Sequence, residues 1–503
     1  MKQYDVVIIG SGMGGLVCGN ILSLEGYSVC VLEKNKQIGG CLQTFVRDKV
    51  IFDSGVHYIG GLGEGQTLYQ VFKYLGLMNQ LKLRQMKEAA FDKIIIGNDP
   101  QEYTYAQGYD KFIEALVADF PEEKEAIKIY CDKIREVCGK FPMYNLQYNI
   151  DAEAKASVQE IDAQAYIESL TSNKKLQAVL AGNNILYAGK SHQTPFYIHA
   201  LILNSYIESS WKCIDGGSQI AKYLAKNIRE QGGEILRHSE VKKIIIEDGL
   251  ATGVALANGN KIGGKHFISN LHPVQTLELT DTDLIRKAYR NRMKQLENTI
   301  SSFTLNIVLK KESFRYLSHN YYYHKEGQLW TMADYTEENW PLGYALFLSA
   351  SSRSPEYAES MTIFTYMRYD EVKPWQHTFN TVSAEEERGE TYEAFKKRKA
   401  ETLLDCVEER FPGLREHIQT YYTSTPLSYR DYIGTDDGTM YGIAKDYKDP
   451  VKTYIAPRTK VPNLYLTGQN LNLHGILGTT ISALITSVTL TGDERIIEKV
   501  RNA

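Results

Sequence analysis

The hydrophobic and polar positions at the start of the chain predict a strand, a helix and a second strand. The run from Asp5 to Ile9 is almost continuously apolar, as in a buried strand. A glycine-rich turn follows, and then a helix over about Gly14 to Glu25 that Gly26 stops. The second strand covers Ser28 to Leu32. Together these elements form one βαβ unit, the building block of a parallel sheet.

The turn of this unit carries a G-x-G-x-x-G motif made of Gly10, Gly12 and Gly15. The first glycine makes the turn, the second lets backbone approach a pyrophosphate, and the third lets helix and strand pack closely. Phosphate charge would then lie at a helix N-terminus. Glu33 ends the second strand, where a carboxylate can accept hydrogen bonds from ribose hydroxyls. The glycines alone fit a turn in any α/β protein, but all these features together predict a dinucleotide site.

A glycine pair beyond the acidic residue distinguishes between the two common dinucleotides. Gly39 and Gly40, in "KNKQIGGCLQTF", would let the chain pass close to a cofactor. Such a pair is typical of FAD enzymes of the amine oxidase and phytoene desaturase type. No second G-x-G-x-x-G occurs in the sequence, so we expect FAD and no NAD(P)H domain.

A later block predicts one helix and three or four strands. Ser218 is predicted to cap the helix, and a glycine pair at Gly232 to end it. Asp248-Gly249 and Asn258-Gly259 are hairpin signals between the strands. The closing strand, Lys265 to Ser269, is expected to return to the parent sheet.

Two longer regions lie between these blocks and carry no catalytic signature. Residues 106–195 are helix-like and charged, whereas residues 290–454 mix strand-like runs with a helix from Ala384 to Arg410. Tyr321 to Tyr323 are predicted to form a surface strand. The predicted fold class is α/β: a Rossmann-like FAD-binding domain of the amine oxidase type with an inserted, discontinuous α+β substrate domain. The FAD-binding domain is predicted to comprise 1–105, 205–290 and 455–503, and the substrate or lid domain 106–204 and 291–454.

Composition and charge argue against a polyanion partner. The 503 residues carry a formal net charge of -4 with interspersed signs, so we expect no nucleic acid. The seven cysteines form no C-x-x-C pair, which predicts a reduced protein without a structural metal. The N-terminus leaves no room for a signal peptide, so a cytoplasmic location is expected.

One uncharged stretch, Val461 to Gly492, is long enough to cross a bilayer by length alone. Its many Gly, Thr, Ser and Asn residues instead favour a buried, cofactor-facing strand and helix.

Several segments carry a family resemblance: "GGCLQTF" (39–45), "FDSGVHYIGG" (52–61), "FYIHALILNSYIESSWKCIDGGSQIAKYL" (196–224), "TPLSYRDYIGTDDGTMYGI" (425–443) and "LYLTGQNLNLHGILGTTISA" (464–483). They resemble the phytoene desaturase, carotenoid isomerase and retinol saturase superfamily, and its retinol saturase branch most. Desaturases more often have G-G-R after the acidic residue and G-D in the last motif. This sequence has Cys41 and Gln469 at those positions.

The resemblance implies an FAD enzyme that acts on carbon-carbon double bonds of a long, apolar, conjugated substrate. It implies that the adenosine diphosphate half is held by Gly10, Ser11, Gly12, Met13, Gly14, Gly15, Glu33 and Lys34, and adenine by the backbone of Val241. The remaining implied contacts, from the pyrophosphate and ribitol to the flavin ring, are Gly40, Cys41, Gly468, Gln469, Gly475, Gly478, Thr479 and Thr480. The helix near Gly478 would aim its N-terminus at the flavin.

Saturation of a double bond needs a hydride, which reduced flavin can deliver, and a proton from a nearby acid. His57 and Tyr58 follow the first FAD block, so either could give that proton or hold the flavin ring. His57 could also be a packed core residue or contact the substrate. His474 is expected to line the flavin and His199 to be structural. Cys41 is expected to fill a tight turn, with covalent or redox chemistry as the alternative.

Saturation of a polyene is the first functional hypothesis. The alternatives are a carotenoid-type desaturase or isomerase, an amine oxidase and, from another class, a prenyl-lipid carrier of the same fold without FAD. Glu33 and the complete glycine set argue against the carrier. An apolar substrate has to leave a membrane, so we also expect peripheral contact with the inner face of a bilayer through the lid. The resemblance names no electron donor.

Overall fold

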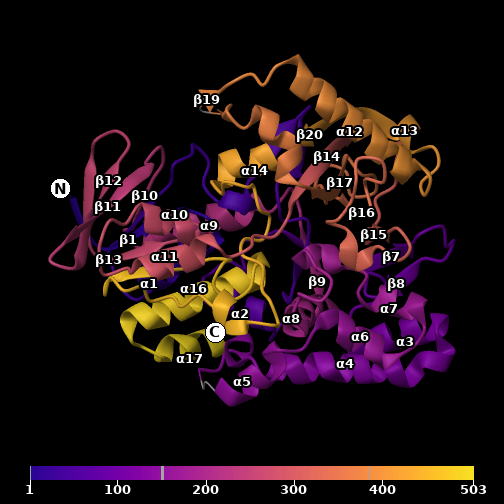
Figure 1. The fold of residues 1–503 in the computed structure, drawn as a ribbon, viewed down its shortest axis with the longest axis horizontal. Coiled ribbons are helices and arrows are strands. Elements are labelled where there is room, and N and C mark those ends of the chain that lie inside the picture. The colour runs from indigo at the N-terminus through magenta and orange to yellow at the C-terminus, as the bar shows by residue number, and fades with distance from the viewer. Residues whose placement is uncertain (1, 149–151, 383) are drawn as a thin grey trace.

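The computed structural model describes residues 2–148, 152–382 and 384–503. The chain forms two large sheets, which lie on the left and right of Figure 1. The segments that build each sheet are interleaved along the sequence. Helix α14 (Pro426–Ile433) lies between the two halves of the molecule in the same view.

The first sheet contains the predicted βαβ unit. Its strands are β1 (Lys2–Ile9), β2 (Val29–Leu32), β10 (Glu234–Leu236), β11 (Val241–Glu247), β12 (Leu250–Leu256), β13 (Lys261–Ser269) and β21 (Leu464–Leu466). They follow the order β10-β2-β1-β13-β12-β11, with β21 parallel to β13. The predicted return of Lys265 to Ser269 to the parent sheet is confirmed, because β13 pairs parallel with β1. The Asp248-Gly249 hairpin is also confirmed, between β11 and β12.

Two helices pack against each other and against this sheet. They are α1 (Met13–Leu24), which follows β1, and α16 (Gly475–Thr491), which follows β21. Helix α9 (Ser218–Glu230) also contacts α1. The Rossmann-like fold class predicted from the sequence is therefore confirmed.

Ser218 does not cap α9, which corrects the prediction. Gly217 is the N-cap, and its N–H donates to Asp53 Oδ1 at 2.7 Å. The Ser218 hydroxyl instead accepts a hydrogen bond from Thr44 Oγ1 at 2.9 Å. A carboxylate distant in sequence thus satisfies the helix start that a local serine was expected to satisfy.

The second sheet is mostly antiparallel. Its strands are β7 (Asp92–Ile96), β8 (Tyr103–Tyr105), β14 (Ser301–Leu309), β15 (Asn320–His324), β16 (Gly343–Leu348), β17 (Ser360–Met367) and β20 (Ile418–Ser424). They follow the order β20-β14-β17-β16-β15-β7-β8. Residues 92–105, which the sequence grouped with the FAD-binding segments, hydrogen-bond into this sheet through the parallel pair β7 and β15. The domain boundaries stay a prediction.

The prediction of a surface strand at Tyr321 to Tyr323 was wrong. All three tyrosines of β15 are buried, with at most 6% of each side chain exposed. The strand lies between β7 and β16, so both of its edges are paired and both of its faces are covered. Three consecutive tyrosines, each with a polar hydroxyl, suggested a solvent-exposed strand. They are buried because neighbouring elements, which the local sequence does not show, pack against them.

The helical region is confirmed, and its helices are α3 (Tyr109–Asp119), α4 (Lys124–Gly139), α5 (Ala152–Gln159), α6 (Ala163–Leu170), α7 (Lys174–Leu180) and α8 (Phe196–Glu208). Helix α12 covers Glu390–Glu408 and begins later than the predicted Ala384. The short strands β18 (Asn380–Thr381) and β19 (Ala384–Glu385) precede it, and Gly389 with φ 80° separates them from the helix.

A small three-stranded sheet lies next to the predicted catalytic pair. It consists of β5 (Ile59–Gly60), β6 (Leu83–Gln85) and β9 (Ser210–Cys213), with β9 in the middle. His57 and Tyr58 directly precede β5. The hairpin of β3 (Thr44–Arg47) and β4 (Val50–Asp53) comes just before them.

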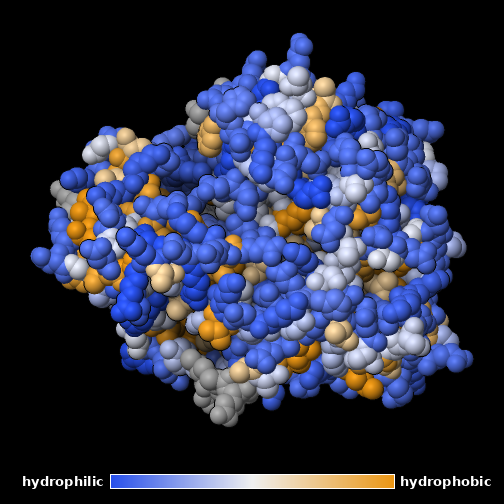
Figure 2. Space-filling model, in the orientation of Figure 1, coloured by the Kyte–Doolittle hydropathy of each residue, from blue (hydrophilic) through white to orange (hydrophobic). Residues whose placement is uncertain are grey.

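The apolar stretch from Val461 to Gly492 contains strand β21 and helix α16, as predicted. Among the described helices, none combines the length and the apolar character needed to cross a bilayer. Figure 2 shows one face of the molecule, which is largely hydrophilic with hydrophobic residues in separate patches.

Gly15→Ala is expected to destabilise the fold. A Cβ at Gly15 would lie 2.1 Å from the backbone oxygen of Gly10, so α1 has to move away from β1. We expect a loss of roughly 2–4 kcal/mol in the free energy of unfolding, measured by urea denaturation. Gly139→Ala is the control, because Gly139 is also helical and a Cβ there meets nothing within 4 Å. That variant should be neutral or gain up to about 1 kcal/mol. Equal stability of the two variants would contradict the argument.

Candidate dinucleotide and substrate cavity

A cavity of about 810 Å³ opens at the carboxyl ends of β1 and β13. This edge of an open parallel sheet is where ligands bind in such folds. Most of the positions implied by the family resemblance line it: Gly10, Ser11, Gly12, Met13, Gly14, Glu33, Lys34, Gly40, Cys41, His57, Tyr58, Val241, Gln469, Gly475 and Thr479. His474 lines it too. The structure therefore brings together segments that are more than 400 residues apart.

Four of the implied positions support the walls and do not line the cavity. Gly15 holds α1 against β1, as the third glycine of the motif was expected to do. Gly468 lies under Gly14, and a Cβ on Gly14 would reach Gly468 Cα at 2.9 Å. Gly478 leaves room for Leu473, and Thr480 donates to the backbone oxygen of Ile476 at 2.7 Å.

Two helix N-termini point into this cavity. The first residues of α1, Met13 and Gly14, line it, and so do the first residues of α16, Gly475 and Ile476. Neither helix has a side-chain cap. Backbone N–H groups of a first turn have no partner inside their own helix and carry partial positive charge. The cavity is thus suited to negative charge at two separate places.

Glu33 lies where a ribose would be expected. Its Oε2 accepts hydrogen bonds from the Ser11 hydroxyl at 2.5 Å and from the Ser11 N–H at 3.2 Å, and its Oε1 accepts from the Asn35 N–H at 2.8 Å. These contacts hold the carboxylate at the end of β2, beside the glycine turn. A carboxylate oxygen can accept further hydrogen bonds, so hydroxyl donors of a ligand can still bind.

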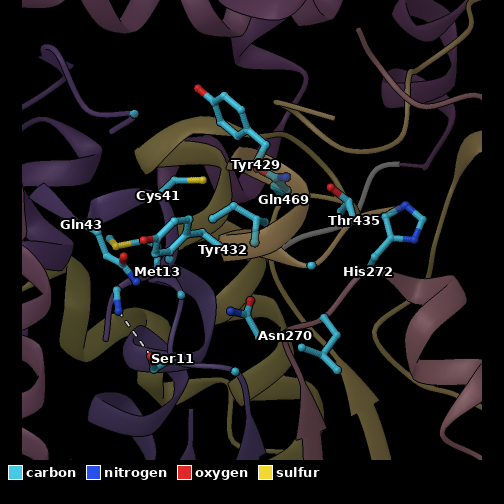
Figure 3. Close-up of a pocket in the computed structure, with 18 of the residues that line it drawn as sticks. Ser11, Met13, Cys41, Gln43, Asn270, His272, Tyr429, Tyr432, Thr435 and Gln469 are labelled. Carbon is cyan, nitrogen blue, oxygen red and sulfur yellow. Dashed lines mark hydrogen bonds between the residues drawn. The ribbon is translucent and has the colours of Figure 1, made fainter. Parts of the chain in front are cut away.

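Sequence reasoning missed several residues of the cavity, among them Gln43, Asn270, His272, Tyr429, Tyr432 and Thr435. Figure 3 shows Ser11 and Asn270 toward one side and Cys41, Tyr429 and Gln469 toward the other. A Cβ on Gly12 would meet Asn270 Nδ2 at 2.8 Å, so this amide lies directly over the glycine turn. Asn270 directly follows the parallel strand β13, and this position could have predicted from the sequence that it lines the cavity.

The other end of the cavity is aromatic. The His57 ring stacks on Phe347 with centroids 4.5 Å apart, and Tyr58 stacks on Tyr206 at 4.3 Å. His474 stacks on Tyr441 at 4.3 Å. Flat apolar walls of this kind suit a planar ring or a conjugated chain.

His57 and His474, two of the histidines that line the cavity, are neutral at pH 7. Burial, with a smaller contribution from the Lys212 charge, lowers the pKa of His57 to about 3. Burial also lowers the pKa of His474 to about 4, although the Leu186 carbonyl lies 2.9 Å from its Nε2 and partly offsets the shift. His199 contacts two tyrosine hydroxyls, those of Tyr130 at 2.6 Å and Tyr187 at 2.9 Å, in a fully buried position.

Tyr58 differs from these histidines because its hydroxyl belongs to a hydrogen-bond network. It donates to Asp92 Oδ2 at 2.9 Å and lies 2.6 Å from the Tyr322 hydroxyl. Asp92 and Tyr322 come from β7 and β15 of the second sheet. The network thus reaches from the cavity into the interior of the other half of the molecule.

Cys41 lies in the 3-10 turn Gly40–Leu42. Burial raises the pKa of its thiol to about 11. The thiol therefore stays protonated at pH 7, where it is a poor nucleophile.

Known proteins match this chain both in its first segment and over most of its length. The family model described as "NAD(P)-binding Rossmann-like domain" matches residues 8–75. An all-trans-retinol 13,14-reductase of Rattus norvegicus is 26% identical over 97% of this chain and 85% of that protein. A chloroplastic prolycopene isomerase of Daucus carota is 27% identical over 88% of this chain and 72% of that protein. The crystal structure of an oxidoreductase from Methanosarcina mazei has a TM-score of 0.65 at 16% identity, and the match covers 97% of this chain and 100% of the other.

These matches define the class of the protein: an α/β enzyme with a Rossmann-like dinucleotide-binding domain. Within that class, the chain is a homologue of all-trans-retinol 13,14-reductases and prolycopene isomerases. The resemblance predicted from the motifs is thereby confirmed.

Asp53 should make stability fall as the pH rises. Burial raises its pKa to about 7, against the opposing effects of the Gly217 N–H and the Lys212 charge. The unfolded carboxyl loses its proton near pH ~4. Between these values the folded state binds more protons, so the free energy of unfolding decreases with pH.

Asp53→Asn should flatten this decrease by an amount on the order of a few kcal/mol between pH ~4 and ~7, measured by urea unfolding. Glu64→Gln, at an exposed position, serves as the control and should leave the pH dependence unchanged. An unchanged slope in Asp53→Asn would contradict the assignment.

Proposed function

We propose that the protein is an FAD-dependent oxidoreductase that saturates a carbon-carbon double bond of a long, apolar polyene of the retinoid or carotenoid kind. The observation that carries the proposal is one continuous cavity with a dinucleotide-type end and an aromatic end. The homology to retinol reductases and prolycopene isomerases supports the choice of polyene as the substrate class.

The residues of the cavity fit FAD. Backbone at Gly12 and Gly14 leaves a cradle in which any Cβ would collide with Asn270. The N-terminus of α1 suits a pyrophosphate, and that of α16 suits a flavin ring that gains negative charge on reduction. Thr435 Oγ1 is buried at the cavity and has no hydrogen-bond partner within the described protein, so a ligand can satisfy it.

The proposed contacts along FAD follow this geometry. Glu33 would hold the ribose and the Val241 backbone the adenine, while Gln469 would contact the ribitol or pyrophosphate without adding charge. Gly475 and Thr479 would lie beside the flavin ring. Gly468 and Gly478 would act through the walls that they support.

FAD supplies the hydride in its reduced form, and the chain has to supply the proton. Tyr58 is the proposed donor, because its hydroxyl is part of a hydrogen-bonded network that can replace the proton. His57 is neutral and no hydrogen bond holds its ring among the described residues, so we assign it to packing against Phe347 and the flavin. The aromatic wall would exclude water from the reacting carbons.

Isomerisation is the second candidate reaction, favoured by the prolycopene isomerase relative. The same cavity serves both reactions, since each requires a polyene against the flavin. The two differ in outcome: saturation consumes one double bond and two electrons, whereas isomerisation has no net redox change.

Anaerobic mixing of the reduced flavoprotein with retinoids and carotenoids tests the reaction. Saturation predicts reoxidation of the flavin together with loss of polyene absorbance. A geometric isomer without flavin reoxidation would assign isomerisation instead. A protein that is colourless and takes up no FAD would contradict the proposal as a whole.

Tyr58→Phe should lower turnover by about 10²- to 10⁴-fold while the flavin content stays normal. The hydroxyl that gives the proton is lost, but the ring that stacks on Tyr206 is kept. His57→Gln is the comparison and should cause a much smaller loss. A larger loss in His57→Gln than in Tyr58→Phe would transfer the donor role to His57.

We also propose peripheral contact with a membrane at a basic groove beside the cavity mouth. The groove is lined by four exposed cations and no acid: Lys36, Lys222, Arg229 and Arg237. Val382 borders it and is 61% exposed, and nearby Phe379, which lines the cavity, is 40% exposed. Cations with an adjacent apolar edge complement an anionic phospholipid surface.

Sedimentation with vesicles tests this surface. The protein should pellet with vesicles of phosphatidylcholine and phosphatidylglycerol at low salt, and less with phosphatidylcholine alone. The double variant Lys222→Glu, Arg229→Glu should reduce pelleting. Lys226→Glu, on the same helix but outside the groove, is the control. Equal pelleting of both variants would refute the assignment.

A further inference from the structure

We propose that Asp92 is the proton store for the cavity and supplies Tyr58 with the proton that Tyr58 delivers. This inference rests on the proposed function, in which Tyr58 gives a proton to a substrate carbon. Asp92 acts through Tyr58 and does not line the cavity, so it is a positioning residue that also holds a proton.

The geometry links one carboxyl to one phenol. Asp92 Oδ2 lies 2.9 Å from Tyr58 Oη, and Asp92 Oδ1 accepts a hydrogen bond from Asn320 Nδ2 at 2.9 Å. Asp92 and Asn320 are direct partners in the parallel pairing of β7 with β15. Tyr322, two residues further on the same strand, lies 2.6 Å from Tyr58 Oη. The register of two strands thus holds all three groups around the Tyr58 hydroxyl.

Asp92 is fully buried and has only neutral hydrogen-bond partners. Within the described ranges, no lysine, arginine or histidine forms an ion pair with it. Burial raises the pKa of Asp92 to about 7, and the hydrogen bonds from Asn320 and Tyr58 offset only part of this effect. The carboxyl is therefore partly protonated near neutral pH, which is the condition for storing a proton.

The charged and titratable groups that face this carboxyl are few. Tyr58, Tyr105, Tyr206 and Tyr322 surround it, and burial raises the pKa of each above the usual value for tyrosine. Among the described residues, Lys212 on β9 is the one charged neighbour that affects the pKa of Asp92, and burial lowers the pKa of Lys212 itself to about 7. Its Nζ donates to the Leu348 carbonyl at 2.7 Å, so it stabilises the carboxylate through space and not by an ion pair.

Two protons move in the proposed step. A protonated Asp92 donates from Oδ2 to Tyr58 Oη, which leaves the phenolic proton of Tyr58 free to move to a substrate carbon. As the O–H bond of Tyr58 breaks, the proton on Asp92 Oδ2 passes to Tyr58 Oη. The double bond gains this proton together with a hydride from reduced flavin, and Asp92 remains as a carboxylate until it takes up a proton from solvent. Tyr58 never has to persist as a phenolate, which its raised pKa makes costly.

Asp92→Asn separates proton storage from structure. The amide can still accept from Asn320 and donate to Tyr58, but it has no proton to give at this pH. In flavin-loaded protein we expect turnover to fall about 100-fold with normal flavin content. We expect wild type to lose activity as the pH rises through about 7, and this loss should disappear in Asp92→Asn.

Asp53→Asn is the matched control. Asp53 is also a buried carboxyl with a pKa raised to about 7 and with Lys212 as a neighbour, but it does not contact Tyr58. Its substitution should leave the pH profile of turnover unchanged. Infrared difference spectra between pH ~5 and ~9 give a readout independent of turnover. The carbonyl band of a protonated carboxyl should lose one component in each variant.

The outcomes are distinct. If Asp92→Asn keeps turnover within about twofold of wild type and keeps the pH profile, or loses no infrared component, the inference is overturned. If Asp92→Asn fails to bind flavin, the infrared spectrum of Asp53→Asn decides, because this variant keeps Asp92 and lacks the Asp53 signal. Absence of a protonated carboxyl that titrates near pH ~7 in this variant overturns the inference. If wild type turns over no polyene, the proposed function fails, and that result is separate from the infrared result.

Discussion

The close contact between α1 and the carboxyl ends of β1 and β13 is the constraint on which the rest of the site depends. Gly15 has no Cβ because the Gly10 carbonyl occupies that place, and Gly14 lies against Gly468 of the last segment. Helix α1 also packs against α16, and the first residues of both helices line the cavity. Two positive helix ends therefore face one cavity, and its suitability for an anionic ligand follows from backbone geometry more than from charged side chains.

The second half of the molecule contributes to the site from a distance. Asp92 of β7 and Tyr322 of β15 lie within hydrogen-bond distance of the Tyr58 hydroxyl, while Phe347 of β16 stacks on His57. The second sheet thus adds buried polar groups next to the aromatic end of the cavity. In the proposed function, these groups supply the proton. A fold of this kind can separate the cofactor's chemistry from the acid that completes it.

Local patterns predicted well those elements whose cause is local. The βαβ unit and the hairpin at Asp248-Gly249 depend on residues near in sequence, and both were confirmed. The errors arose where partners come from far away. Asp53 satisfies the start of α9 in place of Ser218, and Tyr321 to Tyr323 are buried because two other strands enclose β15.

The sequence by itself determined the Rossmann-like βαβ unit of this protein, because its glycine turn, helix start and terminal acid lie within one short unit of chain. Only the tertiary structure showed that the Tyr58 hydroxyl belongs to a hydrogen-bond network, whereas the His57 ring stacks on Phe347. The two residues are adjacent and look equally suited in sequence. They differ in their neighbours, because Asp92 and Tyr322, which are 34 and 264 residues from Tyr58 in sequence, lie beside the Tyr58 hydroxyl. No local pattern records that register, since strand pairing between distant segments is settled only when the whole core packs.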